Sequence, residues 1–337
     1  FMSHHGLFLS LPLAYFVPFA TVRKPSCLHR PCRKSWRTRA RPAHRYDPPM
    51  SPATTSTRTW NADKIQQVLK WMVYTLLVIN FAFYIGEDWN RIGYTLTPES
   101  TILDWMAEFA TSIDVLGWIL LLCMLELETY VLEDETWKGW VAYAVRGVRF
   151  GCYAMIAHTL YAAVLTTINL QPTVAVENVS DLCSMVEEDV SYVYNLEYTD
   201  VTLESCSTLS TETEFYWVTS EQIVTDEVGL ELERVLAWID LWEVVLWLLI
   251  LVAIETVVRL RNRGITEGPI LSVTNSLKLS MYLVLIGFGI YWASLSHWLY
   301  LWDELLWIAG FATIEMNITK WRDQLQVEQR DPQPNPL

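Results

Sequence analysis

The apolar residues of this chain come in long unbroken blocks rather than at the short periods of a soluble core. Blocks of this length are typical of helices that cross a bilayer, because the hydrocarbon layer requires about 20 apolar residues per helix. The pattern therefore predicts an all-α integral membrane protein with six transmembrane helices. These helices are expected at residues 66–87, 104–130, 142–170, 234–260, 271–299 and 302–320.

The basic residues of the connecting segments predict the orientation of the helices, because Lys and Arg in short loops favour the cytoplasmic side. One side of the membrane would hold only Arg91 and Arg234. The other side would hold Arg58, Lys64, Lys70, Lys138, Arg146, Arg149, Arg259, Arg261, Arg263, Lys278, Lys320, Arg322 and Arg330. This asymmetry predicts a multi-pass protein of the plasma membrane, as in a bacterial inner membrane, with the N- and C-termini cytoplasmic.

The segment 171–233 is then an acidic extracytoplasmic loop. It carries fifteen Asp and Glu residues and no Lys or Arg. The stretches 198–203 and 214–219 alternate as strands do, so short β-strands are expected in the loop. Cys183 and Cys206 both lie in it, and an oxidising exterior makes them a candidate disulfide. The loop is also a candidate surface for a protein partner.

The two ends of the chain differ from the rest in composition. The first 49 residues hold nine basic residues and one acid, which favours a disordered or upstream-translated leader over 1–60, with Met50 as the natural start; a targeting segment is the alternative. The remainder has a net charge of −22, which argues against nucleic acid as a partner. The polar tail 323–337 is expected to be disordered. Helices fill 61–170 and 234–322.

A short pattern recurs in the second, fourth and sixth blocks, where an acid is followed by Trp after four residues and by Glu after twelve. The three copies are Asp114, Trp118 and Glu126; Glu243, Trp247 and Glu255; and Asp303, Trp307 and Glu315. The other blocks place a base four residues before a Tyr, at Lys70–Tyr74, Arg149–Tyr153 and Lys278–Tyr282. Together these patterns predict three repeated helical hairpins. A rival frame that pairs 128–129 with 255–256 covers only two copies, and chance recurrence is the simpler alternative.

The paired acids are the candidate functional residues. Twelve residues span about 18 Å of helix, less than the roughly 30 Å of hydrocarbon, so at least one carboxylate per block is expected inside the membrane. Such a group should face protein or water rather than lipid. The inner acids have basic neighbours, which predicts intramembrane ion pairs that either close a path or only hold the hairpins together. These pairs would join Glu126, Glu255 and Glu315 to Lys70, Arg149 and Lys278.

The outer acids Asp114, Glu243 and Asp303 have no such basic neighbours in the sequence. The same zone also contains Asp104, Glu108, Asp240 and Glu304. Carboxyl groups in this setting must be hydrated, protonated or bound to a cation. They therefore predict either a wet outer vestibule or a path for protons or for monovalent or divalent cations.

Catalytic signatures, nucleotide-binding loops and metal-type Cys/His spacings are absent from the sequence. The sequence therefore predicts neither an enzyme nor a cofactor or metal centre. His158 and His297 are more simply packing residues than haem ligands or proton relays. The first functional hypothesis is a small cation or proton transporter or channel that uses intramembrane carboxylates. The alternative is a non-transporting membrane subunit or sensor whose acidic loop binds a partner.

Overall fold

A computed structural model describes residues 56–130, 140–218, 220–263, 265 and 268–313 of the 337-residue chain. The predictions for the leader up to residue 55, including Met50, and for the tail 323–337 lie outside these residues. The contacts divide the described chain into a large unit, 75–309, and a second unit that includes 56–74 and 310–313. All tertiary contacts given below belong to the large unit.

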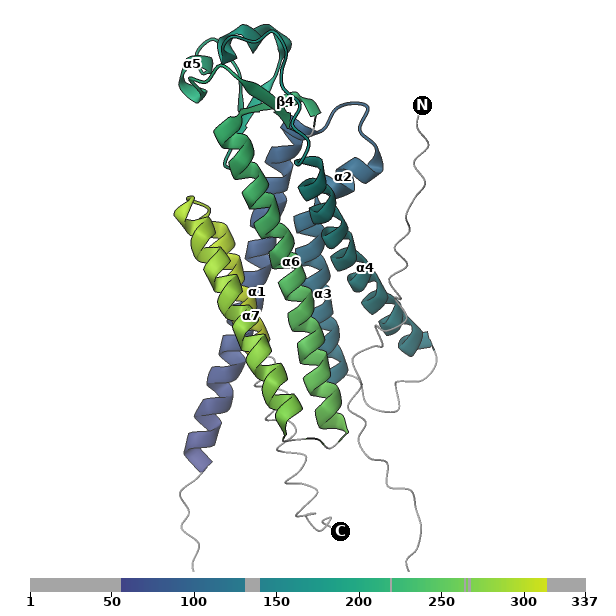
Figure 1. Cartoon of the computed structure of the whole chain (residues 1–337). Coiled ribbons are helices and arrows are strands. Elements are labelled where there is room, and N and C mark those ends of the chain that lie inside the picture. Colours follow the sequence, from purple (N-terminus) through teal and green to yellow (C-terminus); the bar gives the residue numbers. More distant parts are fainter. Residues whose placement is uncertain (1–55, 131–139, 219, 264, 266–267, 314–337) are drawn as a thin grey trace, which may run out of the picture. The chain divides into compact units, whose positions relative to one another are not determined.

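The structure is mostly helical (Figure 1). Its main helices are α1 (Ser56–Thr95), α2 (Ile102–Glu108), α3 (Ala110–Tyr130), α4 (Trp140–Asn169), α6 (Glu227–Asn262) and α7 (Pro269–Ser294), and residues 298–313 are also helical. Four stretches are long and apolar enough to cross a membrane: Gln67–Thr95, Tyr143–Asn169, Glu227–Val257 and Pro269–Ser294. The bent pair α2–α3 makes a fifth if it is counted as one span. The last predicted span, 302–320, extends beyond the described residues.

Within the large unit the long helices pack side by side. Helix α4 contacts both α3 and α6, and α6 also contacts α7. Gly117 lets α3 approach α4 closely, because a Cβ at this position would lie 3.2 Å from Met155 Cβ. Arg234 of α6 donates to Leu170 O at 2.7 Å and to Gln171 O at 2.8 Å. Carbonyl groups at the end of a helix lack partners within it, so these bonds fix the end of α4 to the first third of α6.

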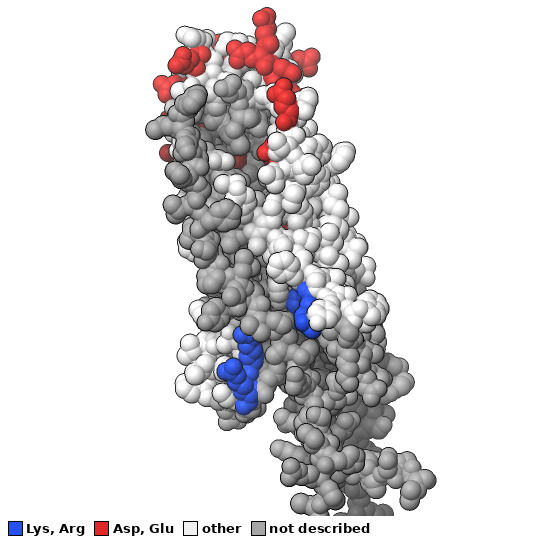
Figure 2. All heavy atoms as spheres, turned by 90° about the vertical axis from the view of Figure 1, so that its right-hand side faces the viewer, with Lys and Arg blue, Asp and Glu red and all other residues white. Residues whose placement is uncertain are grey.

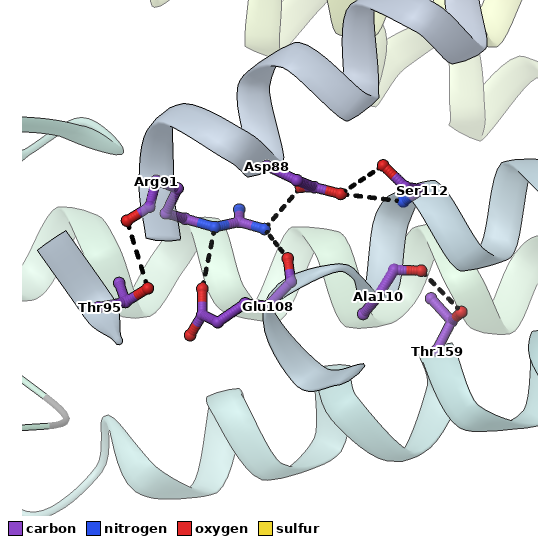
Figure 3. A network of polar contacts seen from close by, with 7 residues as sticks. All are labelled: Asp88, Arg91, Thr95, Glu108, Ala110, Ser112 and Thr159. Atoms are coloured by element: carbon purple, nitrogen blue, oxygen red, sulfur yellow. Dashed lines mark hydrogen bonds and ion pairs between the residues drawn. The ribbon is translucent and has the colours of Figure 1, made fainter. Parts of the chain in front are cut away.

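The helix predicted over 104–130 is instead two helices, α2 and α3, bent by 71°. Asp88 of α1 accepts hydrogen bonds from Ser112 N at 3.1 Å and from Ser112 Oγ at 2.6 Å, in the first turn of α3. Arg91, one turn further along α1, donates to Glu108 O at 2.7 Å and to the Glu108 carboxylate at 3.2 Å, at the end of α2 (Figure 3). Both helix ends at the break therefore find polar partners on α1, which makes the break tolerable.

Residues 170–226, between α4 and α6, fold into a small domain that we call the cap. It contains η2 (Leu182–Glu188), β1 (Ser191–Tyr194), β2 (Glu197–Asp200), α5 (Cys206–Leu209), β3 (Phe215–Val218) and β4 (Ser220–Asp226). The strands form one mixed sheet in the order β2-β1-β4-β3, with β1 and β4 parallel and the outer pairs antiparallel. The strand-like stretches 198–203 and 214–219 overlap β2 and β3, so short strands do occur in the acidic segment.

The cap has an apolar core of its own. Its buried members are Leu182, Met185, Val190, Tyr192, Val201, Cys206, Phe215 and Val224. A disulfide joins Cys183 to Cys206, 23 residues apart, and so ties η2 to α5 beside this core. A crosslink over a loop of this length stabilises a fold by about 3 kcal/mol. On the face drawn in Figure 2, acidic side chains gather over the cap, whereas basic side chains lie toward the far end of the helices.

Candidate functional site

Five carboxyl groups from three helical segments gather among the helices, and we call them the carboxyl cluster. They are Asp114 of α3, Asp240 and Glu243 of α6, and Asp303 and Glu304 of the segment 298–313. Each lies close enough to more than one of the others to interact with its charge. The structure therefore brings together the three acids singled out in the sequence, Asp114, Glu243 and Asp303, although they come from distant parts of the chain.

Neutral N–H groups hold the carboxyl groups of the cluster. Trp292 Nε1 of α7 donates to Glu243 Oε1 at 2.8 Å, and Trp247 Nε1 of α6 donates to Glu304 Oε1 at 3.3 Å. Asn80 Nδ2 of α1 donates to Asp303 Oδ1. Such donors satisfy the hydrogen bonds of an oxygen without supplying an opposite charge, so they leave the charge of a carboxylate uncompensated.

Hydroxyl and indole groups complete the surroundings of Asp114 and Asp303. Trp118 and Thr159 are hydrogen-bonding neighbours of Asp114. Trp307 and Tyr84 are hydrogen-bonding neighbours of Asp303. In the sequence pattern each Trp follows its acid by one helical turn, which places the two side chains on the same face of the helix.

Several polar atoms in this region are buried. In the part of the chain that the structure describes, Asp114 Oδ1, Glu304 Oε2 and Asn80 Oδ1 are buried without a hydrogen-bond partner. Glu304 is 5% exposed and Asn80 is fully buried. An unsatisfied buried carboxylate oxygen costs several kcal/mol if it is ionised, and much less if the group carries a proton. These buried oxygen atoms make the carboxyl cluster the candidate functional site.

Three tryptophans from the repeated sequence pattern meet beside the carboxyl cluster. The ring centroid of Trp118 lies 6.5 Å from that of Trp247 and 6.2 Å from that of Trp307. Tyr282 of α7 contacts Trp247 edge-on at 6.2 Å. Close aromatic packing of this kind stabilises the contacts between these helices. The three tryptophans occupy equivalent positions of the predicted repeat, and their contact agrees with that equivalence. The repeat itself stays a prediction.

Arg91 brings a positive charge to the cap side of the cluster. It pairs with Asp88 at 2.8 Å and with Glu108 at 3.2 Å, and its charge reaches Asp240. Asp240 is exposed, in contrast to Glu304. In the cap, burial raises the pKa of Tyr198 to about 12, an effect that the neighbouring Arg91 reduces. The sequence marked Arg91 only as a topological signal, although its three-residue spacing from Asp88 is that of a helical ion pair.

The predicted inner ion pairs are only partly described. Arg149, Lys278 and Glu255 are all buried, at 4%, 8% and 7% exposure. Glu255 Oε1 accepts a hydrogen bond at 2.5 Å from Arg259, one turn along the same helix, a partner that the sequence analysis did not select. The side chain of Glu126 and the whole of Glu315 lie outside the described residues, and Lys70 belongs to the second unit. The ring of three pairs therefore stays a prediction.

Sequence reasoning missed two donors of the cluster, Asn80 and Trp292. Asn80 could have been noticed as an amide inside an uncharged apolar block, where a polar side chain is costly unless it has a partner. Trp292 gives no such signal, because tryptophans are frequent throughout this chain. His158 is half-buried, and its Nδ1 atom has no hydrogen-bond partner among the described residues.

Comparison with known proteins adds nothing to this geometry. No family model, no curated protein and no solved structure matches the chain. Among the described residues, no group of three or more His, Cys, Asp or Glu side chains has an arrangement that could hold a metal ion. The functional conclusion therefore depends on the chemistry of the carboxyl cluster.

Proposed function

We propose that the protein binds protons at the carboxyl cluster and carries them across a membrane, as a small transporter or channel. The observation that carries the proposal is the hydrogen bonding of Glu243, Asp303 and Glu304 to indole and amide donors among like-charged neighbours. Carboxylates packed together cannot all be ionised, so protons must be shared among them. A proton also requires no cavity between packed rings, unlike a hydrated metal cation.

The topology that we propose for this function has six transmembrane helices in three hairpins. The cap would lie outside and both termini in the cytoplasm of a cell whose plasma membrane holds the protein. Four or five candidate spans, the helical segment 298–313 and the meeting of the three repeat tryptophans support it. The separation of acidic and basic side chains in Figure 2 agrees with the orientation expected from the positive-inside rule.

The proposed path begins at Asp240, the exposed member of the cluster, next to the charge of Arg91. From there a proton would pass to Glu243, whose charge interacts with those of Asp240, Glu304 and Asp303. Asp114 would be its innermost acceptor in the cluster. The buried bases Arg149 and Lys278 would belong to a constriction that closes the path.

The test is proton flux in proteoliposomes that contain a pH-sensitive dye. The combined variant Asp114→Asn, Glu243→Gln and Asp303→Asn removes three proton-binding groups with little change in shape. Because positioned proton-transfer groups contribute about a hundredfold or more to proton movement, we expect flux to fall by at least about tenfold. The matched control neutralises three exposed acids of the cap, Glu187, Glu188 and Glu197, and should retain the parental flux. Equal flux in the parent and the cluster variant would overturn the proposal.

A second candidate function is a membrane sensor or subunit whose cap binds a partner. The acidic surface of the cap in Figure 2 is the observation that favours it. Parental protein without proton flux, together with capture of a basic protein that is lost in the cap control variant, would favour this function over transport.

A further inference from the structure

The turn between β1 and β2 connects the cap to the helices. Its two central residues, Asn195 and Leu196, have φ angles of 56° and 60°, and they join the paired residues Tyr194 and Glu197. Two left-handed residues in a two-residue hairpin make a type I′ turn, for which asparagine is a favoured first residue. The turn is therefore a tight and well-defined structure rather than a variable loop.

This turn contacts the helices through backbone and side-chain atoms. Asn195 Nδ2 donates to Leu295 O at 3.0 Å, and His297 Nε2 lies 2.9 Å from Asn195 O. Because a carbonyl oxygen only accepts, His297 Nε2 carries the proton and donates it. Leu196 N donates to Glu233 Oε1 of α6 at 2.9 Å. The turn thus binds the junction between α7 and the segment 298–313, where Ser296 reverses the chain with a φ of 76°.

From His297 one line of contacts leads to Glu243. The His297 ring meets the Trp292 ring edge-on, with centroids 5.8 Å apart. Trp292 is the indole that donates to Glu243 Oε1. The position of the Trp292 ring, which is 2% exposed, therefore depends on the ring that the cap turn holds.

A second line of contacts leads to Asp303. The His297 ring stacks on Tyr300, with centroids 5.4 Å apart and planes 10° apart. Tyr300 in turn stacks on Tyr84 of α1 at 6.2 Å. Tyr84 is a hydrogen-bonding neighbour of Asp303. Both lines start at His297, which contacts Asn195 of the cap turn, and they end at different members of the carboxyl cluster.

We propose that the β1–β2 turn regulates the carboxyl cluster, with Asn195 and His297 as positioning residues that keep Trp292 on Glu243 and the Tyr84–Tyr300 stack beside Asp303. Displacement of the turn uncovers Glu243 and changes its access to protons. The inference rests on the proposed function in one respect, namely that protons bind at Glu243 and Asp303. The contacts themselves hold whether or not the protein transports anything.

The experiment measures how readily Glu243 reacts with dicyclohexylcarbodiimide, an apolar reagent for protonated carboxyl groups. The full chain in lipid vesicles is labelled, digested and quantified by peptide mass spectrometry. His297→Phe keeps a flat ring and loses the N–H donor, whereas His297→Gln keeps an N–H donor and loses the ring. Asn195→Gly keeps the left-handed turn and loses the amide contact with Leu295. The matched control is Asn178→Gly, at an exposed left-handed asparagine of the cap with a φ of 62°.

Loss of one hydrogen bond shifts a local equilibrium by about fivefold, so Asn195→Gly and His297→Phe should each raise Glu243 labelling about fivefold. His297→Gln should raise it too, because it loses the ring contact with Trp292. Asn178→Gly should label as the parent does. Equal labelling of Glu243 in the parent and all three contact variants, including no labelling in any, overturns the proposal.

The two proposals fail in different ways. If the parent carries no protons but the contact variants label Glu243 more strongly, the transport function fails and the positioning role stands. If the parent carries protons and the labelling is unchanged, the reverse holds. Size-exclusion chromatography of each variant identifies loss of folding, and His297→Gln is the mildest of the three should the others not fold.

Discussion

Glu243 and Glu255 lie on the same helix but in different chemical surroundings. Glu243 accepts a hydrogen bond from the neutral indole of Trp292 at 2.8 Å, and its charged neighbours are other acids. Glu255, twelve residues further along α6, accepts a hydrogen bond from the guanidinium group of Arg259 at 2.5 Å. The helix therefore has a carboxyl group with a neutral donor near its middle and a carboxylate with a cationic donor near its end.

This difference in hydrogen-bond donors allows the same residue type to have two different roles on one helix. A cation beside a carboxylate fixes the ionised form, which suits a structural pair. Neutral donors among like charges leave the protonation of the group free to change, as a proton-binding site requires. On this comparison we propose Glu243 as the proton-binding carboxyl group of α6 and Glu255 as a structural one.

The largest expected effect on the free energy of unfolding comes from replacing the carboxyl groups of Glu255 and Glu243, one at a time, by an amide of the same shape. Glu255→Gln should lower the free energy of unfolding by about 2 kcal/mol, because Arg259 loses its charged partner. Glu243→Gln should lower it by less than about 0.5 kcal/mol, because the amide oxygen still accepts from Trp292 and, among the described residues, no cation hydrogen-bonded to Glu243 loses its partner. Unfolding of each variant in detergent is followed by circular dichroism. A larger loss at Glu243 than at Glu255 would contradict the comparison.

The sequence predicts the parts of this comparison that depend on spacing along one helix. The acid, Trp and Glu pattern selected Asp114, Glu243 and Asp303, and the structure brings these three acids into one cluster. The pattern also predicts that each acid shares a helix face with the Trp that follows it, because residues four apart occupy the same face. The charge and the alternating pattern of 171–233 predicted the acidic segment with its short strands, and the two cysteines of that segment, Cys183 and Cys206, are joined in the structure.

Contacts between distant segments could not be predicted in this way. Asn80 and Trp292 reach the cluster from α1 and α7. Asn80 stands out only as an amide in an apolar block, which does not reveal its partner, and no pattern distinguishes Trp292 from neighbouring residues. The bend between α2 and α3 depends on Asp88 and Arg91 of another helix, so the apolar pattern of 104–130 gave no sign of it. The docking of the cap turn likewise depends on tertiary contacts over about 100 residues of sequence.

A smaller effect should follow from removing the neutral donor itself. Trp292→Phe keeps an aromatic ring and loses the N–H group that donates to Glu243, so we expect a loss of about 1.5 kcal/mol in unfolding free energy. Trp242→Phe, at a side chain of α6 that is 52% exposed, is the control and should be nearly neutral. In the double variant Trp292→Phe with Glu243→Leu, which removes the acceptor, the two losses should not add, since both remove the same hydrogen bond. Strict additivity would mean that the indole stabilises the fold by packing alone.

The smallest effect extends the comparison to neutral donors outside the membrane-spanning segments. Just before α6, Asp226 accepts hydrogen bonds from Tyr192 Oη at 2.8 Å and from Ser210 Oγ at 2.6 Å. Burial, together with the bond to Asp226 and its charge, raises the pKa of Tyr192 above its usual value near 10. A raised folded-state pKa means that the contribution of this tyrosine to stability is complete below about pH 10 and is lost as the pH rises through the folded-state value.

Tyr192→Phe should therefore cost about 1 kcal/mol at neutral pH, and this cost should shrink above about pH 10, where Tyr192 ionises in the unfolded chain while the folded chain still holds its proton. Thermal unfolding of the full chain, followed by near-ultraviolet circular dichroism between neutral and alkaline pH, measures the difference. Tyr216→Phe is the control, because the Tyr216 hydroxyl group bonds to Glu214 at the surface at 3.3 Å. A cost that stays constant up to alkaline pH would show that folding does not shift the ionisation of Tyr192, and would contradict this extension of the comparison.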